Sequence, residues 1–177
     1  MQADSPDTVG ALTASSNEQS ALPIPTGQTD AGMMLGFRVG DLGFLLPISL
    51  HCEVLDQLSV NPIPNVEPWF NGLLNIRGNI VPVIDLHMLL DIPVNTHTKR
   101  YLFAIGRGEK TMALWIDGYP HMLNGLEKPL PSPHSLPALP DRLRHHAVDT
   151  YVHNGQIWLS LQFDLFFKSL GRQDRPS

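Results

Sequence analysis

The stretch FNGLLNIRGNIVPVIDLHMLL, from Phe70 to Leu90, decides the fold that this sequence predicts. Two runs rich in Ile, Val and Leu flank the segment Asn75 to Gly78, and this pattern is typical of a β-hairpin. Gly78 tolerates the positive φ that a hairpin turn needs, and Asn79 beside it suits the same backbone region. Arg77 is therefore expected at the tip or flank of a stiff element.

Two residues near the end of this stretch predict how the hairpin ends. Pro82 has no N–H, so the second strand is expected at a sheet edge or with a bulge at that point. Asp85 precedes the apolar run Leu86 to Leu90, and its carboxylate suits the cap of a short helix. The sequence thus predicts a hairpin followed directly by a helix.

Alternating apolar residues upstream of the hairpin predict three further strands. A first hairpin is expected around the turn Gly40 to Gly43, and a third strand is expected from about His51 to Leu55. In that strand Cys52 and Val54 face one side of the sheet, while Glu53 faces the other.

Proline content and turn residues predict the connections and the second half of the chain. Pro68 is expected in the first turn of a brief helix, and the five prolines between Glu127 and His146 predict a surface crossover. Asn154-Gly155 between alternating apolar runs is a strong hairpin signal. The remaining expected elements are strands at Tyr101 to Ile105 and Met112 to Ile116 and a closing helix at Asp164 to Leu170.

The end of the chain repeats the plan of the opening stretch. The turn Arg77-Gly78-Asn79 is followed by Asp85 and a helix, and the turn Asn154-Gly155-Gln156 is followed by Asp164 and a helix. Two similar subdomains are therefore expected, each a small β-barrel of about five strands, because curling a short sheet removes its exposed edges. The expected fold class is mainly β, with short helices after the hairpins.

Composition limits the partners and the compartment of the chain. The 177 residues are 42% hydrophobic and 16% charged, with a formal net charge of -5, which argues against a nucleic acid or an anionic membrane as the main partner. The single cysteine, Cys52, excludes an internal disulfide and is expected as a small buried apolar group. No run approaches the ~18 apolar residues of a membrane span, and the N-terminus lacks the basic residues of a signal peptide, so a cytoplasmic protein is expected.

Both ends of the chain are expected to be disordered. Residues 1–33 are rich in Ser, Thr, Asp, Gln, Pro and Gly, a composition that buries too little apolar surface to offset the loss of chain entropy. This arm is either a docking peptide or a plain disordered lead. Residues 171–177 are polar and are expected to fray.

The residues that could carry catalysis or hold a metal form no recognisable pattern. The eight histidines include no His-Glu-x-x-His spacing, and the sequence has no Gly-x-Ser-x-Gly, P-loop or dinucleotide motif. Asp85, Asp117 and Asp164 lie near strand ends, where they suit helix caps or turns better than an acid and base pair. No catalytic residue, metal ligand or cofactor is therefore predicted.

Arg77 and Glu53 each allow two interpretations. Arg77 either pairs with a nearby carboxylate or recognises a partner, because its guanidinium offers five donors in a rigid fork and arginine is enriched at interface hot spots. Glu53 is either a solvated residue on the open face of its strand or a matching contact. The residues alone leave both choices open.

The segment Gly72 to Leu86, GLLNIRGNIVPVIDL, resembles the signature of the CheW family, adaptor proteins that couple chemoreceptors to a histidine kinase. The resemblance extends more weakly over Gly36 to Leu170, including Cys52 to Leu55 and Leu161 to Phe166. It implies two five-stranded, SH3-like β-barrel subdomains packed together within residues 34–170. Subdomain 1 would cover about 40–95 and subdomain 2 about 98–160, with the terminal segments completing the barrels.

By this resemblance the chain has no catalytic activity and bridges two proteins. The expected partners are the cytoplasmic tip of a methyl-accepting chemoreceptor and the regulatory domain of a CheA-like histidine kinase. Arg77, with Asn75 and Gly78, matches the motif position associated with partner binding, and Glu53 and Val54 match the strand that lines the receptor groove. The motility that such an adaptor controls is either flagellar or pilus-based. The N-terminal arm resembles the extended forms of type IV pilus twitching systems.

Two other classes of protein remain as alternatives. One is a β-barrel regulatory or ligand-binding module of another signalling or metal-dependent system. The other is a small barrel that binds nucleic acid, which the negative net charge and the lack of a basic stripe argue against.

Overall fold

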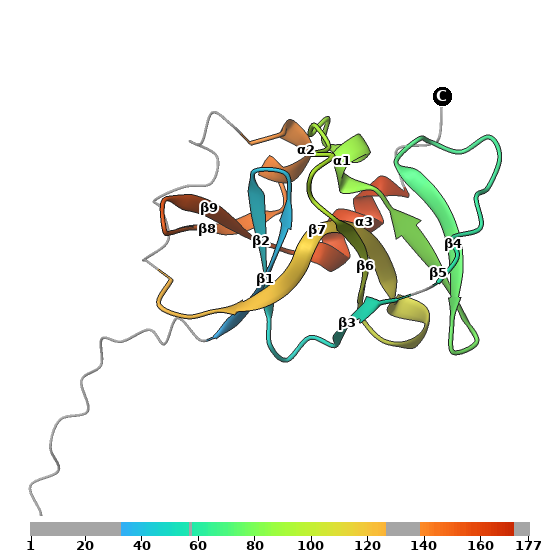
Figure 1. Cartoon of the computed structure of the whole chain (residues 1–177), viewed down its shortest axis with the longest axis horizontal. Coiled ribbons are helices and arrows are strands. Elements are labelled where there is room, and N and C mark those ends of the chain that lie inside the picture. The colour runs from blue at the N-terminus through green and yellow to red at the C-terminus, as the bar shows by residue number, and fades with distance from the viewer. Residues whose placement is uncertain (1–32, 57, 127–138, 172–177) are drawn as a thin grey trace, which may run out of the picture.

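The computed structural model of the protein describes residues 33–56, 58–126 and 139–171, which form a nine-stranded sheet with short helices (Figure 1). The expected mainly β fold is confirmed. The expected N-terminal arm, the C-terminal tail and most of the expected crossover lie outside the described residues. The strands are β1 (Met34–Val39), β2 (Leu42–Pro47), β3 (Cys52–Leu55), β4 (Phe70–Ile76), β5 (Asn79–Ile84), β6 (Arg100–Ile105), β7 (Met112–Leu123), β8 (Ala147–His153) and β9 (Gln156–Leu161). The helical elements are α1 (Leu86–Leu89), the 3₁₀ turn η1 (Gly108–Lys110), α2 (Asp141–Arg144) and α3 (Phe163–Leu170).

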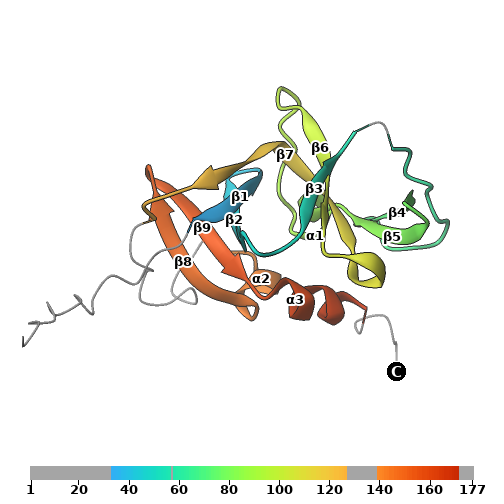
Figure 2. The same cartoon turned by 90° about the horizontal axis from the view of Figure 1, so that it is seen from below.

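The strands group into two lobes that share the long strand β7 (Figures 1 and 2). The first lobe contains β3, β6, the first half of β7, β5 and β4, and the second contains the second half of β7, β1, β2, β9 and β8. This grouping does not follow the order of the chain, because β2 from the first hairpin pairs in parallel with β9 from the last. The expected subdomain boundaries at about 95 and 98 stay a prediction. A division along the lobes would instead place strands from both ends of the chain, β1 and β2 with β8 and β9, in the second lobe.

Strand β7 carries an irregular stretch where it passes from one lobe to the other. Gly36 of β1 pairs with His121, and Arg38 pairs with Asp117, so β7 has two more residues than β1 between these pairs. Gly118 lies in this stretch with a φ of 72°, a left-handed conformation that favours glycine. Bulges of this kind bend a strand and re-aim its side chains. The bend brings the Asp117 carboxylate to the β1–β2 turn on one side and to α1 on the other.

The two ends of the first lobe's sheet, β3 and β4, are tied by local contacts. Asn61 follows β3 and exchanges two backbone hydrogen bonds with Leu73 of β4, at 2.7 and 2.9 Å. An ion pair between Glu53 of β3 and Arg77 in the β4–β5 turn adds a second tie. The lobe therefore approaches the closed barrel that the sequence predicts, although no ladder joins β3 to β4 in the part of the chain that the structure describes.

The largest apolar cluster lies at the junction of the lobes. Phe37 contacts aromatic rings from both sides, with ring centroids 5.2 Å from Phe44, 5.4 Å from Phe103 and 6.0 Å from Phe163. Burial of each such ring stabilises the fold by roughly 1.5–3 kcal/mol. Helix α3 begins where β9 ends and adds Phe166 to the same cluster (Figure 2).

Each lobe also has a smaller cluster of its own. The first lobe's cluster is Leu74, Ile76, Val81, Val83, Leu102, Ala104 and Ala113, and the second lobe's is Leu45, Leu123, Leu126 and Trp158. Strand β6 consequently contributes to two clusters: Leu102 faces the first lobe's interior, while Phe103 and Ile105 face the junction. Alternate residues of one strand thus build the lobe and join it to the other.

The hairpin of β4 and β5 is confirmed, with one change at its turn. Ile76 pairs with Asn79, so the turn consists of Arg77, with a φ of 51°, and Gly78, with a φ of 89°. Positive φ at both turn residues is the type I′ geometry that matches the twist of a two-residue hairpin. Asn79, which the sequence assigns to the left-handed region, is instead the first residue of β5.

Pro82 and Asp85 act largely as expected. Pro82 lies opposite Leu73 of β4, and the pairing of β5 with β7 begins only at Val83. The residue without an N–H therefore stands just outside the part of β5 that is paired on both sides. Asp85 caps α1, because its Oδ1 accepts a hydrogen bond from the backbone N–H of His87 at 3.0 Å.

Two local predictions are wrong. Pro68 begins no helix, because the N–H of Phe70 donates to the carbonyl oxygen of Glu67 and closes a single turn. Asp164 does not cap the closing helix, because α3 already starts at Phe163 and Asp164 lies exposed in its first turn. A carboxylate there still interacts favourably with the positive end of the helix dipole.

Trp158 fills the second lobe because two glycines leave room for its indole ring. Gly43 lies opposite Trp158 in the pairing of β2 with β9, and a Cβ at Gly43 would lie 2.4 Å from the ring. A Cβ at Gly36 would lie 2.7 Å from the same ring. Any side chain at either position therefore forces the indole or the strand to move.

We expect Gly43→Ala to lower the free energy of unfolding by about 1–3 kcal/mol, because it overpacks the cluster around Trp158. Urea denaturation followed by circular dichroism measures the change. Gly171→Ala is the matched control, since a Cβ there meets nothing within 4 Å, and it should change stability by less than about 0.5 kcal/mol. Equal stability of the two variants would contradict this packing.

Candidate functional site

Three of the five residues that the sequence singles out, Asn75, Arg77 and Gly78, lie at the tip of the β4–β5 hairpin, and a fourth, Glu53 of β3, contacts the tip. Arg77 is in the left-handed region although it is not glycine, a conformation that needs support from its surroundings. That support includes the side chain of Asn75, whose Oδ1 accepts a hydrogen bond from the N–H of Gly78 at 2.8 Å. The turn therefore has a fixed shape, and it presents Arg77 towards Glu53 of β3.

Arg77 and Glu53 form a bidentate ion pair. Nη1 of Arg77 donates to Oε1 of Glu53 at 2.9 Å, and Nη2 donates to Oε2 at 2.8 Å. The hydrogen bonds to Glu53, and then its charge, raise the pKa of Arg77 further above its ordinary value. The side chain of Arg77 remains 73% exposed, against 25% for Glu53. The pair is thus fixed in geometry and open to solvent on the arginine side.

This geometry bears on the two interpretations left open by the sequence. Arg77 does pair with a carboxylate, and Glu53 is a matching contact rather than a freely solvated residue. An exposed pair of this kind adds little to stability. Since both hydrogen bonds use one side of the guanidinium, the other side is still available to a partner, so a role of Arg77 in recognition stays a prediction.

The fifth predicted residue, Val54, faces away from the tip. It is partly buried against the cluster at the junction of the lobes and pairs with Phe103 of β6. Alternation along β3 explains the separation, because neighbours in a strand point to opposite faces. Any contact of Val54 with a partner stays a prediction.

A small pocket lies beside the ion pair, between the hairpin tip and the loop that joins β6 to η1. Its volume is about 150 Å³, and Glu53 and Arg77 line it together with His51 and Arg107. Arg107 is exposed and was not predicted from the sequence, because nothing in its local pattern indicates that the β6–β7 connection approaches the tip. Arg107 is recognised only once the pairing of β3 with β6 is known, because this pairing places the loop after β6 beside the start of β3.

A second group of polar residues is buried between α1 and β7. Asp85 accepts a hydrogen bond from Nη2 of Arg100 at 2.9 Å, in addition to capping α1. Oδ2 of Asp117 accepts the N–H of Gly40 at 2.6 Å and lies 2.9 Å from Nε2 of His87. Asp117 is therefore neither a cap nor a turn former but a link between α1, β7 and the β1–β2 turn.

The ring of His87 lies between oxygen atoms of two other parts of the chain. Nδ1 is 3.1 Å from the carbonyl oxygen of Ile92, and Nε2 is 2.9 Å from Oδ2 of Asp117. Both ring nitrogens thus have a hydrogen-bond partner, and His87 links the segment after α1 to β7.

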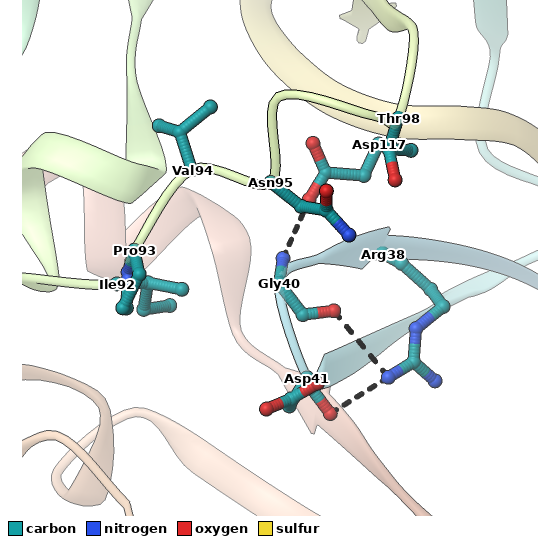
Figure 3. Close-up of a pocket in the computed structure, with 9 residues that line it drawn as sticks. All are labelled: Arg38, Gly40, Asp41, Ile92, Pro93, Val94, Asn95, Thr98 and Asp117. Carbon is teal, nitrogen blue, oxygen red and sulfur yellow. Dashed lines mark hydrogen bonds between the residues drawn. The ribbon is translucent and has the colours of Figure 1, made fainter.

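Asp117 also stands at the wall of a larger pocket of about 420 Å³ (Figure 3). The β1–β2 turn forms one side, where Nη2 of Arg38 donates to the carbonyl oxygen of Asp41 at 2.8 Å. The chain that follows α1, from Ile92 to Asn95, forms the other side. Figure 3 shows the hydrogen bond from the N–H of Gly40 to Asp117, which ties the β1–β2 turn to β7. The polar network thus holds two segments that are far apart in sequence.

Cys52 is half-buried against the cluster at the junction, as the sequence predicts for a small apolar group. Burial raises the pKa of its thiol to about 11, because a thiolate loses hydration there. The thiol form is therefore favoured at neutral pH, and reactivity is correspondingly low.

The described ranges hold no candidate for two other kinds of site. No group of three or more His, Cys, Asp or Glu side chains there lies close enough to hold a metal ion. No helix among the described elements has the length and hydrophobicity needed to cross a membrane.

Comparisons with known proteins give the chain its relatives. The family model described as CheW-like domain matches residues 33–170. Protein PilI of Pseudomonas aeruginosa is 36% identical over 52 residues, which are 29% of this chain and 29% of that protein. Chemotaxis protein CheW of Rhizobium meliloti is 24% identical over 91 residues, 51% of this chain and 59% of that protein. The chain thus aligns with less than two thirds of the length of these curated relatives.

A solved structure has the same fold. The scaffolding protein TtCheW from Thermoanaerobacter tengcongensis matches with a TM-score of 0.60 and 19% sequence identity, over 80% of this chain and 95% of that chain. At this identity the likeness shows the fold alone. It confirms the architecture that the motif in Gly72 to Leu86 predicts.

We expect Asp117→Ala to lower the free energy of unfolding by about 2–4 kcal/mol, because it leaves the N–H of Gly40 and the ring of His87 without their buried acceptor. Asp41→Ala is the matched control, since this exposed carboxylate lines the same pocket. Urea denaturation of both variants measures the difference. Similar stabilities would contradict a structural role for the buried network.

We expect Cys52 in the folded protein to resist alkylation by iodoacetamide at pH 8, where a thiol with a pKa of about 11 is ionised to about one part in a thousand. Intact-mass spectrometry of samples taken over time measures labelling. The same protein in urea is the control, and it should be labelled readily. Equal labelling rates with and without urea would contradict burial of the thiol.

Proposed function

The chain belongs to the CheW-like family, and from this membership we propose that it is a non-enzymatic adaptor that couples a chemoreceptor to a histidine kinase. The observation that carries the proposal is the match of the family model to residues 33–170. The bidentate pair at the hairpin tip supports it, because a rigid and exposed arginine is the kind of residue that anchors protein interfaces. The proposed partners are the cytoplasmic tip of a methyl-accepting chemoreceptor and the regulatory domain of a CheA-like kinase.

The partner-binding residues that we propose are Arg77, Glu53, Asn75 and Gly78 at the tip, with Val54 in the adjoining strand. Glu53 fixes the side chain of Arg77, and Asn75 and Gly78 fix its backbone. A preorganised site loses less conformational entropy on binding. Each contact would be small, at or below ~1,200 Å² in total, and an array would gain strength from many such contacts.

We propose that the pathway controls motility through type IV pili rather than flagella. The support is the similarity to Protein PilI of Pseudomonas aeruginosa over 52 residues. The N-terminal segment of residues 1–33 is consistent with the extended forms that the sequence resembles. The proposed location is the cytoplasm, at receptor arrays.

We expect Arg77→Ala to weaken binding of the cognate receptor tip or of the kinase regulatory domain by about tenfold, the effect typical of an interface hot spot. Isothermal titration calorimetry with each purified partner measures the affinities. Far-UV circular dichroism should stay native, because the side chain of Arg77 is exposed and the pair is not part of the core.

Lys168→Ala is the control for loss of a surface cation, since Lys168 is an exposed residue of α3 outside the tip pocket. It should bind both partners like the wild type. Unchanged affinity of Arg77→Ala for both partners would show that Arg77 serves the hairpin alone. A loss of binding in Lys168→Ala of the same size would show that the effect is one of net charge.

A further inference from the structure

The pocket beside the hairpin tip has an unbalanced charge. Four ionisable residues line it, His51, Glu53, Arg77 and Arg107. Both carboxylate oxygens of Glu53 accept hydrogen bonds from Arg77, so these two charges offset one another. The side chain of Arg107 has no hydrogen bond or ion pair within the described part of the chain, so its positive charge is not compensated there. The guanidinium groups of Arg77 and Arg107 therefore outnumber the one carboxylate of the pocket.

The loop that carries Arg107 is fixed in position. The N–H of Gly106 donates to the carbonyl oxygen of His51 at 2.9 Å, which ties the loop to the start of β3. Gly106 has a φ of 104°, and a Cβ there would lie 2.6 Å from the carbonyl oxygen of Lys110, so the tight turn requires glycine. The N–H of Lys110 donates to the carbonyl oxygen of Arg107 at 3.2 Å. The backbone of Arg107 is thus held on both sides while its side chain is exposed.

Arg107 and Arg77 approach the pocket from two different elements. Arg77 stands on the β4–β5 turn and Arg107 on the β6–η1 loop, and the volume between them is about 150 Å³. That volume suits one side chain of a partner and is too small for a helix. A carboxylate that contacts two guanidinium groups makes more charge-assisted hydrogen bonds than one that contacts a single guanidinium.

We propose that this pocket receives a glutamate or aspartate side chain from the cytoplasmic tip of the receptor, with Arg107 as its main ligand and the free side of Arg77 as the second. This inference rests on the proposed function and on the family resemblance, by which Glu53 and Val54 match the strand that lines the receptor groove. Charge complementarity selects the carboxylate, since the pocket's own carboxylate is already used by Arg77. Arg107 would then determine which receptors bind, because receptors without an acidic residue at that position leave its charge unpaired.

The test compares the full-length wild type with Arg107→Ala and with Lys110→Ala. Lys110 is the matched control, because it is an exposed cation of the same 3₁₀ turn but does not line this pocket. Binding of the cognate receptor tip and of the kinase regulatory domain is measured by isothermal titration calorimetry at 50 and 300 mM NaCl. We expect Arg107→Ala to bind the receptor tip about tenfold more weakly at low salt, with a smaller loss at high salt, and to bind the kinase normally.

A charge exchange adds a second measurement. Arg107→Glu should bind the wild-type receptor tip even more weakly, and changing one acidic residue of the tip to lysine should restore binding to this variant alone. Receptor affinity of Arg107→Ala equal to that of Lys110→Ala would overturn the inference. A loss of kinase binding with receptor binding intact would overturn it as well, since the carboxylate would then belong to the kinase.

The two proposals fail in different ways. If the wild-type chain binds neither partner, the proposed function is overturned and this inference falls with it. If the wild type binds the receptor tip and Arg107→Ala binds it equally well, only the inference is overturned.

Discussion

A single strand, β7, forms hydrogen bonds with β5 and β6 in one lobe and with β1 in the other, so the two lobes can be completed only together. The bulge around Gly118 turns the strand between them and directs Asp117 to the N–H of Gly40 and the ring of His87. Phe37 packs against rings of both lobes in the apolar cluster at the same junction. The two lobes are therefore joined at one junction by the continuous backbone of β7, by a buried polar network and by an apolar cluster.

The hairpin tip owes its stiffness to that junction. Strand β5 is paired on both sides from Val83, and α1, which follows it directly, is capped by Asp85. Arg100 of β6 pairs with the same Asp85, which fastens the base of the hairpin to the sheet. At the far end the ion pair of Arg77 with Glu53 ties the turn to β3. A partner therefore meets a surface whose backbone is already ordered, and it loses less entropy on binding than it would with a flexible loop.

The sequence predicts the parts of this fold that depend on neighbouring residues. The hairpin, its turn and the cap by Asp85 follow from alternation, from Gly78 and from a carboxylate before an apolar run. Local sequence patterns do not indicate which distant segments pair, so the parallel pairing of β2 with β9 was not predicted. The internal repeat suggests barrels in sequence order, whereas pairing interleaves the two ends of the chain.

The candidate site was predictable to the same extent and for the same reason. Arg77 stands in a recognisable motif, and Glu53 is conspicuous as a charge in an apolar strand. Their mutual contact depends on where β3 meets the hairpin tip, and Arg107 reaches the site only through the pairing of β3 with β6.

The most direct test of the adaptor function is co-sedimentation of the kinase with membranes that contain the cognate receptor, measured with increasing amounts of the chain. The account predicts that kinase in the pellet rises from background to saturation as the chain is added. The same amount of kinase in the pellet with and without the chain would contradict it.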